Sequence, residues 1–324
     1  MRKTLLNSTA LVGAFGLALT ANSAMAQDSA DDGAEEVDEN VIIVTATRRA
    51  EDVQEIPIAV TAVSPVQLER QGVVNVQEIT SVSPSFSTSA AQTASGSVVL
   101  RIRGIGTTSN NIGFESAVGI FVDGAYQSRP GVALSEFVDV ERVEVLRGPQ
   151  GTLFGRNTIG GVINIITRKP GALRHSLKVS AGSYNTLMFQ GMTSQAMDNG
   201  VNYRISFDAR ESDNYRQHNE SSYLNGFGKL GYDYSSGSVF AELQYVDDEL
   251  NTPGTLFADE VETDRRQVNP NFATDFSDAT TQVGRLGLVQ EITGNWSFEG
   301  ELTRRDTEGV FRLSSVFGAE TENA

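Results

Sequence analysis

Strict alternation of apolar and polar residues beyond residue 170 is the feature that most constrains how this chain can fold. In residues 202–210, Tyr203, Ile205 and Phe207 alternate with polar neighbours, and residues 295–304 repeat the pattern. A period of two places successive side chains on opposite faces of a β-strand. We count about eight such strands of ~9–11 residues, the length that crosses a bilayer at a tilt.

The connections between these strands differ in length in a regular way. Tight turns at residues 196–200, 235–237 and 293–295 alternate with the longer polar links 211–221 and 247–278. Such alternation is expected when one rim of a β-barrel faces the periplasm and the other faces outside. A soluble β-sandwich also alternates apolar and polar residues and is the main alternative, but its loops would not sort by length so regularly. The pattern favours membrane strands over residues 171–324.

The N-terminus carries the marks of an export signal. Two basic residues precede an apolar stretch at 11–19, and a small-x-small cleavage site ends at Ala26. This predicts a signal peptide over residues 1–26. Residues 27–40 are acidic and lack aromatic side chains, so we expect a disordered linker there.

Residues 50–170 have a mixed α/β pattern that suits a small globular domain. Asp123 and Gly124 form a strong hairpin signal between two short apolar runs. A domain of about 120 residues is large enough to bury its own core. The expected strands are 58–63, 98–103, 118–122, 125–127, 143–147 and 161–167, and the expected helices are 64–70, 75–81 and 138–142.

The end of this domain, ERVEVLRGPQGTLFGRNTIGGVINIITRKP at residues 141–170, joins a charged alternating stretch, a glycine-rich turn and a β-branched strand. It resembles the end of the plug domain in TonB-dependent outer-membrane receptors. The positions that match the signature of this family are Gly104, Gly148, Gly155, Arg156, Asn157, Gly160 and Gly161. The resemblance implies an α/β globular plug domain followed by antiparallel transmembrane β-barrel strands. It also implies a receptor in the outer membrane of a Gram-negative bacterium, in contact with its lipid.

A β-branched run, VIIVTATRR at residues 41–49, lies between the acidic linker and the plug-like domain. An isolated apolar strand is costly unless another chain pairs with it. The run resembles the TonB box, through which the TonB energy transducer grips these receptors, and β-augmentation would supply the affinity. The alternative is that it is the first strand of the plug. The TonB-binding residues implied by the resemblance are Val41, Ile42, Ile43, Val44, Thr45 and Ala46.

The resemblance also suggests which residues join the plug to the barrel and which meet the ligand. The plug arginines Arg101, Arg103 and Arg147 are expected to face barrel carboxylates, and the candidate partners are Glu242, Glu299 and Glu301. Ligand contacts in this family come from plug loops, here residues 107–117 and 126–135. The candidates are Asn110, Asn111, Phe114, Tyr126, Gln127 and Arg129. Their hydrogen-bonding groups and aromatic faces suit a ferric siderophore and also an oligosaccharide.

Composition argues against several other classes of function. The glycines at 148, 151 and 155 are not followed by Gly-Lys-Ser/Thr, so the phosphate-loop pattern fails. Absence of cysteine removes disulfides and thiolate metal sites, and two histidines leave little for catalysis or metal binding. A net charge of −16 argues against nucleic acid as a partner. We therefore expect no enzyme, no cofactor and no metal site.

Eight strands are too few to enclose a plug. A barrel of eight strands holds only its own side chains, whereas a plugged lumen is found at about 22 strands. We therefore expect an incomplete barrel, from the N-terminal part of a longer receptor or a truncated product. The expected function is active import of a scarce nutrient, such as a ferric siderophore, energised by TonB. The alternatives are TonB-dependent uptake of carbohydrate or cobalamin, and a passive porin-like or surface-binding barrel.

Overall fold

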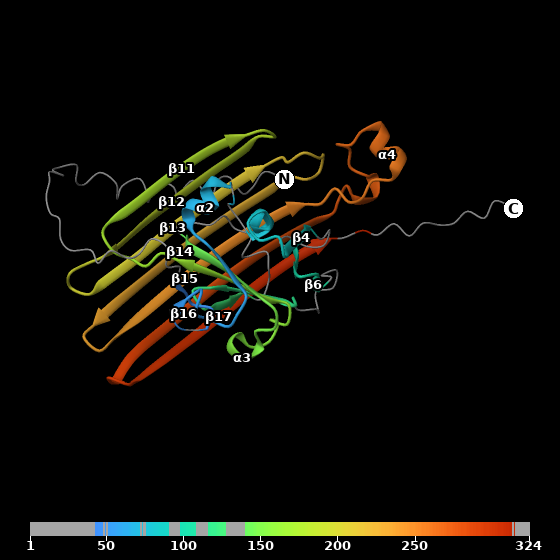
Figure 1. Ribbon diagram of the computed structural model, residues 1–324. Coiled ribbons are helices and arrows are strands. Elements are labelled where there is room, and N and C mark those ends of the chain that lie inside the picture. The colour runs from blue at the N-terminus through green and yellow to red at the C-terminus, as the bar shows by residue number, and fades with distance from the viewer. Residues whose placement is uncertain are drawn as a thin grey trace. The chain divides into compact units, whose positions relative to one another are not determined.

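The structure is a computed structural model that describes residues 43–47, 49, 51–71, 73, 76–90, 98–107, 116–127, 140–312 and 314. These residues belong to one compact unit, Ile42–Ala324. Short strands and helices make up the part before residue 168, and a long antiparallel sheet follows from residue 174 (Figure 1). The expected signal peptide and acidic linker lie outside the described residues.

The first part is an α/β domain, as the sequence predicts. Its strands are β1 (Ile43–Val44), β2 (Glu51–Asp52), β3 (Val60–Val63), β4 (Phe86–Ala90), β5 (Val98–Ile102), β6 (Ile105–Gly106), β7 (Val118–Val122), β8 (Ala125–Gln127), β9 (Val140–Arg147) and β10 (Gly161–Thr167). Its helices are α2 (Pro65–Arg70), the 3₁₀ helix η1 (Val76–Ser81) and α3 (Gly151–Phe154).

A five-stranded sheet in the order β3-β9-β10-β7-β8 forms the centre of this domain. Strand β10 pairs in parallel with β7 and antiparallel with β9. The helix expected at 138–142 is wrong for residues 140–142, which belong to β9. Val140 and Arg142 pair with Thr167 and Ile166 of β10, so the neighbouring strand supplies ladder partners for this stretch.

Two buried clusters of apolar side chains stabilise the domain. The larger cluster joins η1, β5, β7, β9 and β10, and its fully buried members include Ile79, Leu100, Ile102, Ile120, Val143, Val145 and Ile163. The smaller cluster consists of Val44, Ala46, Phe121, Leu146, Phe154 and Val162. Because β9 and β10 contribute to both clusters, the sheet is buried on its two faces, which accounts for the apolar runs in its central strands.

The hairpin predicted at Asp123 and Gly124 is confirmed. Their φ angles are +47° and +81°, and positive values at both central residues are those of a type I′ turn. The turn joins β7 and β8, which pair antiparallel from Ile120–Gln127 to Val122–Ala125. A glycine is also required at 161, where φ is +145° and a Cβ atom would lie 2.2 Å from the carbonyl oxygen of Leu146.

The second part is a seven-stranded antiparallel sheet in which each strand pairs with the next along the chain (Figure 1). Its strands are β11 (Arg174–Gly182), β12 (Thr186–Ala196), β13 (Val201–Ser212), β14 (Ser221–Tyr234), β15 (Gly237–Asn251), β16 (Phe276–Thr293) and β17 (Trp296–Arg312). The described strands thus number seven, against about eight expected. The helix α4 (Ala258–Thr263) and the 3₁₀ helix η3 (Pro270–Phe272) lie in the connection between β15 and β16.

The apolar side chains of this sheet are exposed and its polar side chains are buried, which is the reverse of the arrangement in a water-soluble protein. Leu177, Leu243 and Leu302 are 75%, 72% and 70% exposed, whereas Arg204 and Asp208 are buried. A soluble β-sandwich buries its apolar face, so the alternative fold fails on this observation. Apolar side chains facing outward and polar side chains facing inward are typical of strands in a membrane barrel.

Among the described residues, the helices are too short or too polar to cross a membrane.

Candidate functional site

The segment Ile43–Ala46 is seated on the α/β domain. Strand β1 pairs with β2 through two residues, Ile43 with Asp52 and Val44 with Glu51. The side chains of Val44 and Ala46 are completely buried in the smaller apolar cluster. This segment therefore contributes to the core of the domain, as expected if it were the domain's first strand.

A buried carboxylate fixes the polar residue of this segment. The Thr45 N–H donates to Glu144 Oε1 at 2.8 Å, and the Thr45 hydroxyl donates to the same oxygen at 3.2 Å. Glu144 is fully buried on β9, and its carboxylate also accepts from Arg142 Nε at 2.7 Å and Asn164 Nδ2 at 3.1 Å. Hydrogen bonds to a charged group in an apolar setting are stronger than neutral ones, so Glu144 holds Thr45 firmly.

The resemblance predicts that Val41 to Ala46 contact TonB, and the structure adds how part of that segment is held. Val41 and Ile42 lie outside the described residues. Ile43 is 43% exposed, while Val44, Thr45 and Ala46 face the domain. β-Augmentation by a partner would require these residues to leave their seat. Their binding to TonB stays a prediction.

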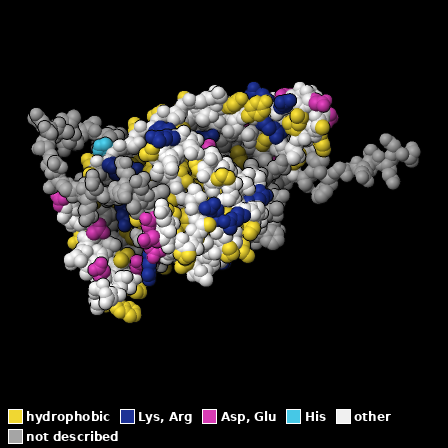
Figure 2. Space-filling view, viewed as in Figure 1, with side chains coloured by type: hydrophobic (Ala, Val, Ile, Leu, Met, Phe, Trp, Pro, Cys, Tyr) yellow, Lys and Arg dark blue, Asp and Glu magenta, His cyan; other side chains and the backbone are white. Residues whose placement is uncertain are grey.

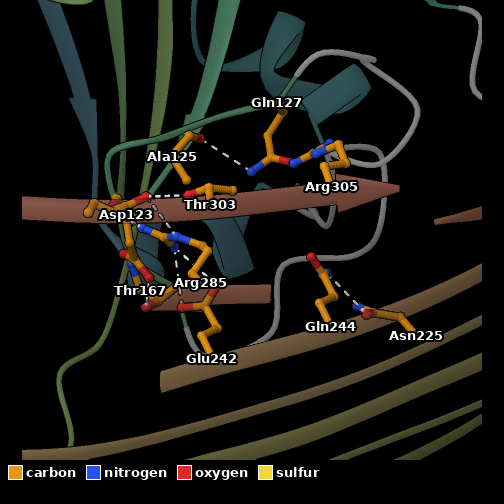
Figure 3. A network of polar contacts seen from close by, with 11 residues as sticks. Asp123, Ala125, Gln127, Thr167, Asn225, Glu242, Gln244, Arg285, Thr303 and Arg305 are labelled. Atoms are coloured by element: carbon orange, nitrogen blue, oxygen red, sulfur yellow. Dashed lines mark hydrogen bonds and ion pairs between the residues drawn. The ribbon is translucent and has the colours of Figure 1, made fainter. Parts of the chain in front are cut away.

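A second polar cluster lies between the α/β domain and the long sheet (Figure 3). Arg285 on β16 is 5% exposed and donates to Glu242 Oε1 on β15 at 3.0 Å and to Glu301 Oε2 on β17 at 2.8 Å. Its Nη2 also lies 3.4 Å from the backbone oxygen of Asp123, in the β7–β8 turn. The Asp123 side chain accepts from the N–H of Thr167 at 2.8 Å, which ties the turn to the end of β10.

A second arginine of the sheet contacts the same hairpin at its other end. Arg305 Nη2 on β17 donates to Gln127 Oε1 at 2.6 Å. The amide nitrogen of Gln127 donates to the backbone oxygen of Ala125 at 3.2 Å, which turns the amide oxygen toward Arg305. The neighbouring Tyr126 hydroxyl accepts from Asn157 Nδ2 at 2.8 Å. The long sheet therefore contacts both the turn and the last residue of the hairpin.

The structure does not bring the three plug arginines onto the barrel carboxylates. Arg101 donates to Ser89 Oγ at 2.9 Å, Arg147 lies against the carbonyl oxygens of residues 59 and 60, and Arg103 is exposed. Glu242 and Glu301 bond to Arg285 instead, because the strand register places Glu242 directly opposite Arg285 and Glu301 diagonally across from it, two residues before Thr303. Glu299 is exposed. Within the described residues, Glu242 and Glu301 therefore pair with a barrel arginine, and the contact of the three plug arginines with barrel carboxylates stays a prediction.

Two of the six expected ligand-binding residues fall within the described ranges, and both already have partners within the protein. Tyr126 packs against Phe121 with ring centroids 5.5 Å apart, and Gln127 is 8% exposed. The remaining expected residues, Asn110, Asn111, Phe114 and Arg129, lie outside the described residues.

Sequence reasoning missed the residues that hold these clusters together, namely Arg142, Glu144, Asn164, Arg285 and Arg305. A signal was available for three of them. Glu144 interrupts the apolar run of a buried strand, and Arg285 and Arg305 occupy inward positions of alternating strands. A charge at such a position predicts a buried partner.

The β11–β12, β13–β14 and β15–β16 connections lie at one end of the long sheet and contact one another. Arg216, between β13 and β14, donates to the backbone oxygens of Pro253 at 3.3 Å and Gln267 at 2.9 Å, both in the connection between β15 and β16. Arg266 lies over the rings of Tyr184 and Tyr215 at 5.6 and 5.7 Å. Burial lowers the pKa of Arg216 from its ordinary value, and Glu260 partly opposes this.

Figure 2 shows acidic and basic side chains close together over the α4 segment. The first turn of α4 carries Asp259 and Glu260. This end of the sheet therefore presents charged residues, in contrast to the apolar outer face of the strands.

Comparison with known proteins agrees with this architecture. Residues 52–162 match the family model of the TonB-dependent receptor plug domain. The chain is 31% identical over 134 residues to the pesticin receptor of Yersinia pestis, which covers 41% of the chain and 19% of that receptor. It is 27% identical over 225 residues to the vitamin B12 transporter of Vibrio vulnificus, covering 67% of the chain and 35% of that transporter.

The fold is also that of a solved receptor. The crystal structure of the ferric yersiniabactin uptake receptor from Yersinia pestis matches with a TM-score of 0.71 and 19% identity, over 80% of this chain and 42% of that one. The chain spans less than half the length of each of these proteins. Residues 52–162 are therefore similar to the plug domain of TonB-dependent receptors, and the antiparallel strands that follow, with polar residues inward and apolar residues outward, share the fold of the barrel of such a receptor.

Proposed function

We propose that this protein is an active-transport receptor of the outer membrane, energised by TonB and importing a ferric siderophore. The observation that carries the proposal is the seat of Ile43–Ala46, a short strand held on the plug by the buried Glu144. Its two-residue pairing with β2 is small enough to be exchanged for a partner strand. Such an exchange is the form that β-augmentation takes.

Transport on this proposal needs no covalent chemistry. Cargo binds from outside and loosens the plug, TonB takes hold of the segment from Val41 to Ala46, and pulling opens a path beside the plug. Removing this segment takes Val44 and Ala46 out of the smaller apolar cluster and leaves Glu144 without the two donors of Thr45. An unpaired buried carboxylate is costly. Binding of the segment by TonB is therefore energetically coupled to a rearrangement of the plug.

A passive porin-like barrel is the competing function, and a deletion separates the two. We expect a receptor that lacks residues 41–46 to reach the outer membrane and bind cargo but to lose uptake. Radiolabelled cargo retained on cells and cargo delivered inside would be measured separately. Uptake at the wild-type rate by the deletion variant would reject the TonB-energised function, because a passive barrel has no use for the segment.

The cargo is proposed from the relatives. The ferric yersiniabactin receptor shares the fold and the pesticin receptor shares sequence over the plug, which supports an iron chelate. The similarity to a vitamin B12 transporter supports cobalamin as a second candidate. We expect a gene deletion to slow growth under iron limitation and to leave growth on limiting carbon or with limiting cobalamin unchanged. Normal growth under iron limitation combined with a cobalamin requirement would reverse the assignment.

A further inference from the structure

The β7–β8 hairpin is the part of the plug that the described barrel strands contact through hydrogen bonds at both ends. Arg285 reaches the backbone oxygen of Asp123 in the turn, and Arg305 reaches the side chain of Gln127 at the end of β8 (Figure 3). The hairpin forms one edge of the central plug sheet. Its position is therefore set from the barrel side as well as by its own sheet.

The two arginines differ in how their charges are balanced. Arg285 is matched by the carboxylates of Glu242 and Glu301. Within the described ranges, Arg305 forms no ion pair, and its hydrogen-bond partner is the neutral amide oxygen of Gln127. A bond from an arginine to a neutral acceptor is weaker than an ion pair with two carboxylates. Both arginines contact the hairpin itself through a neutral oxygen, and the contact of Arg305 with Gln127 is the shorter, at 2.6 Å against 3.4 Å for Arg285 and Asp123.

A continuous set of contacts runs from Gln127 to the seat of the N-terminal segment. Tyr126, next to Gln127, packs against Phe121 with ring centroids 5.5 Å apart. Phe121 is 3% exposed and belongs to the smaller apolar cluster with Val44 and Ala46. A shift of β8 that moved Tyr126 would therefore alter the apolar seat in which the segment lies.

We propose that Arg305 is a positioning residue for the N-terminal segment: through Gln127 it holds Tyr126 against Phe121, and Phe121 keeps the seat of Val44 and Ala46 closed. This inference depends on the proposed function in one respect only, namely that the N-terminal segment is the part of the receptor that TonB binds. Loss of the Arg305–Gln127 bond loosens a seat whose residues lie far from Gln127 in the sequence. Cargo that displaced Gln127 from Arg305 would loosen the N-terminal segment through the same contacts of Tyr126 and Phe121.

Hydrogen exchange of the membrane-embedded receptor, without cargo or TonB, tests the coupling. We expect Arg305→Met to speed exchange of the amides of residues 125–127 about tenfold, the scale of one hydrogen bond to a charged group. We expect the amides of Thr45 and Ala46 to exchange severalfold faster in the same variant. Arg305→Lys keeps the charge and one donor, so it should restore most of the protection and cover the case in which the methionine variant misfolds.

The matched control is Arg304→Met, one position along the same strand on the opposite face. The Arg304 side chain is 87% exposed and pairs loosely with Asp306 at 3.7 Å, so this variant should exchange like the wild type. In a Phe121→Leu background, Arg305→Met should no longer affect residues 45 and 46, because the connecting contact is already weakened. Faster exchange at 125–127 with unchanged exchange at 45 and 46 would overturn the coupling. If the receptor did not bind TonB, the proposed function would be contradicted, but the coupling of Arg305 to residues 45 and 46 would remain valid.

Discussion

At the residue scale, two of the buried charges in the described part of the chain, Glu144 and Arg285, are compensated in different ways. Glu144 is neutralised by Arg142 and by the donors of Thr45 and Asn164, all within the plug. Arg285 is neutralised by carboxylates on the two adjacent barrel strands. Because one partner alone would be an uncompensated buried charge, each cluster behaves as a unit.

Glu144→Gln should loosen the N-terminal segment, because the neutral amide keeps the shape of the side chain but weakens the bond from Thr45. Val44→Cys provides the probe, since the chain has no other cysteine and Val44 is fully buried. We expect maleimide to label the introduced thiol at position 44 about tenfold faster when Glu144 is replaced by glutamine, as loss of a charge-assisted hydrogen bond would give. Equal labelling rates would mean that Glu144 does not hold the segment.

Removal of Arg285 should be far more costly than removal of the exposed Arg304. Arg285→Met leaves Glu242, 6% exposed, without its cation, and breaking a buried pair costs about 3–5 kcal/mol. Arg304→Met removes an outward-facing side chain from a loose pair at 3.7 Å and leaves no buried carboxylate without its cation, so its cost should be far smaller. Urea unfolding of the receptor in lipid vesicles would give both free energies of unfolding. A difference near zero would show that Glu242 is hydrated despite its burial.

At the scale of elements, the outer connections of the sheet form one interlocked group. The Arg216 guanidinium bonds to carbonyl groups of the connection between β15 and β16, and the N–H of Gln217 donates to the backbone oxygen of Arg266 at 2.7 Å. The ring of Tyr184, between β11 and β12, lies 5.8 Å from that of Tyr215. These contacts make the connection between β15 and β16 an ordered structure rather than a loose loop.

Arg216→Met should release the connection between β15 and β16. The variant leaves the carbonyl groups of residues 253 and 267 without this donor, so we expect chymotrypsin to cleave after Phe257 roughly tenfold faster, since cleavage follows local opening. Arg265→Met is the matched control, because Arg265 is exposed and adjacent to the contacts of Arg266. Equal cleavage of the two variants would show that Arg216 does not set the opening rate.

At the scale of the whole molecule, the outward apolar face of the long sheet decides the environment. Leu243 faces outward and is 72% exposed, whereas its neighbour Gln244 faces inward and donates to Asn225 Oδ1 at 3.2 Å. Exposed apolar side chains on successive strands would drive association in water. In a bilayer the same face lies against lipid, which removes the cost.

A lysine placed on each face tests this orientation. Leu243→Lys should destabilise the membrane-inserted receptor by about 2–4 kcal/mol if the position is near the bilayer midplane. Gln244→Lys should cost less, because an inward side chain reaches a polar lumen. The readout is the free energy of unfolding in vesicles of defined lipid. A larger loss from Gln244→Lys than from Leu243→Lys would contradict the assignment of the faces.

The sequence by itself determined the features that depend on local periodicity and turn chemistry. The alternation of residues 202–210 predicted the strand and its two faces, and Asp123-Gly124 predicted the hairpin, because each signal lies within a few residues. The helix expected at 138–142 failed over residues 140–142 because pairing with β10 overrode local preference. The plug signature was readable for the same reason as the hairpin, since its residues lie close together in sequence.

Only the tertiary structure decided which charged residues meet. Thr45 and Glu144 are 99 positions apart, Arg285 and Asp123 are 162 apart, and Arg305 and Gln127 are 178 apart. Many carboxylates were chemically suitable for the plug arginines, and strand register selected Arg285 as the partner of Glu242 and Glu301 instead. The local sequence does not determine which residues of distant segments lie opposite one another, because this depends on how the plug and the sheet pack.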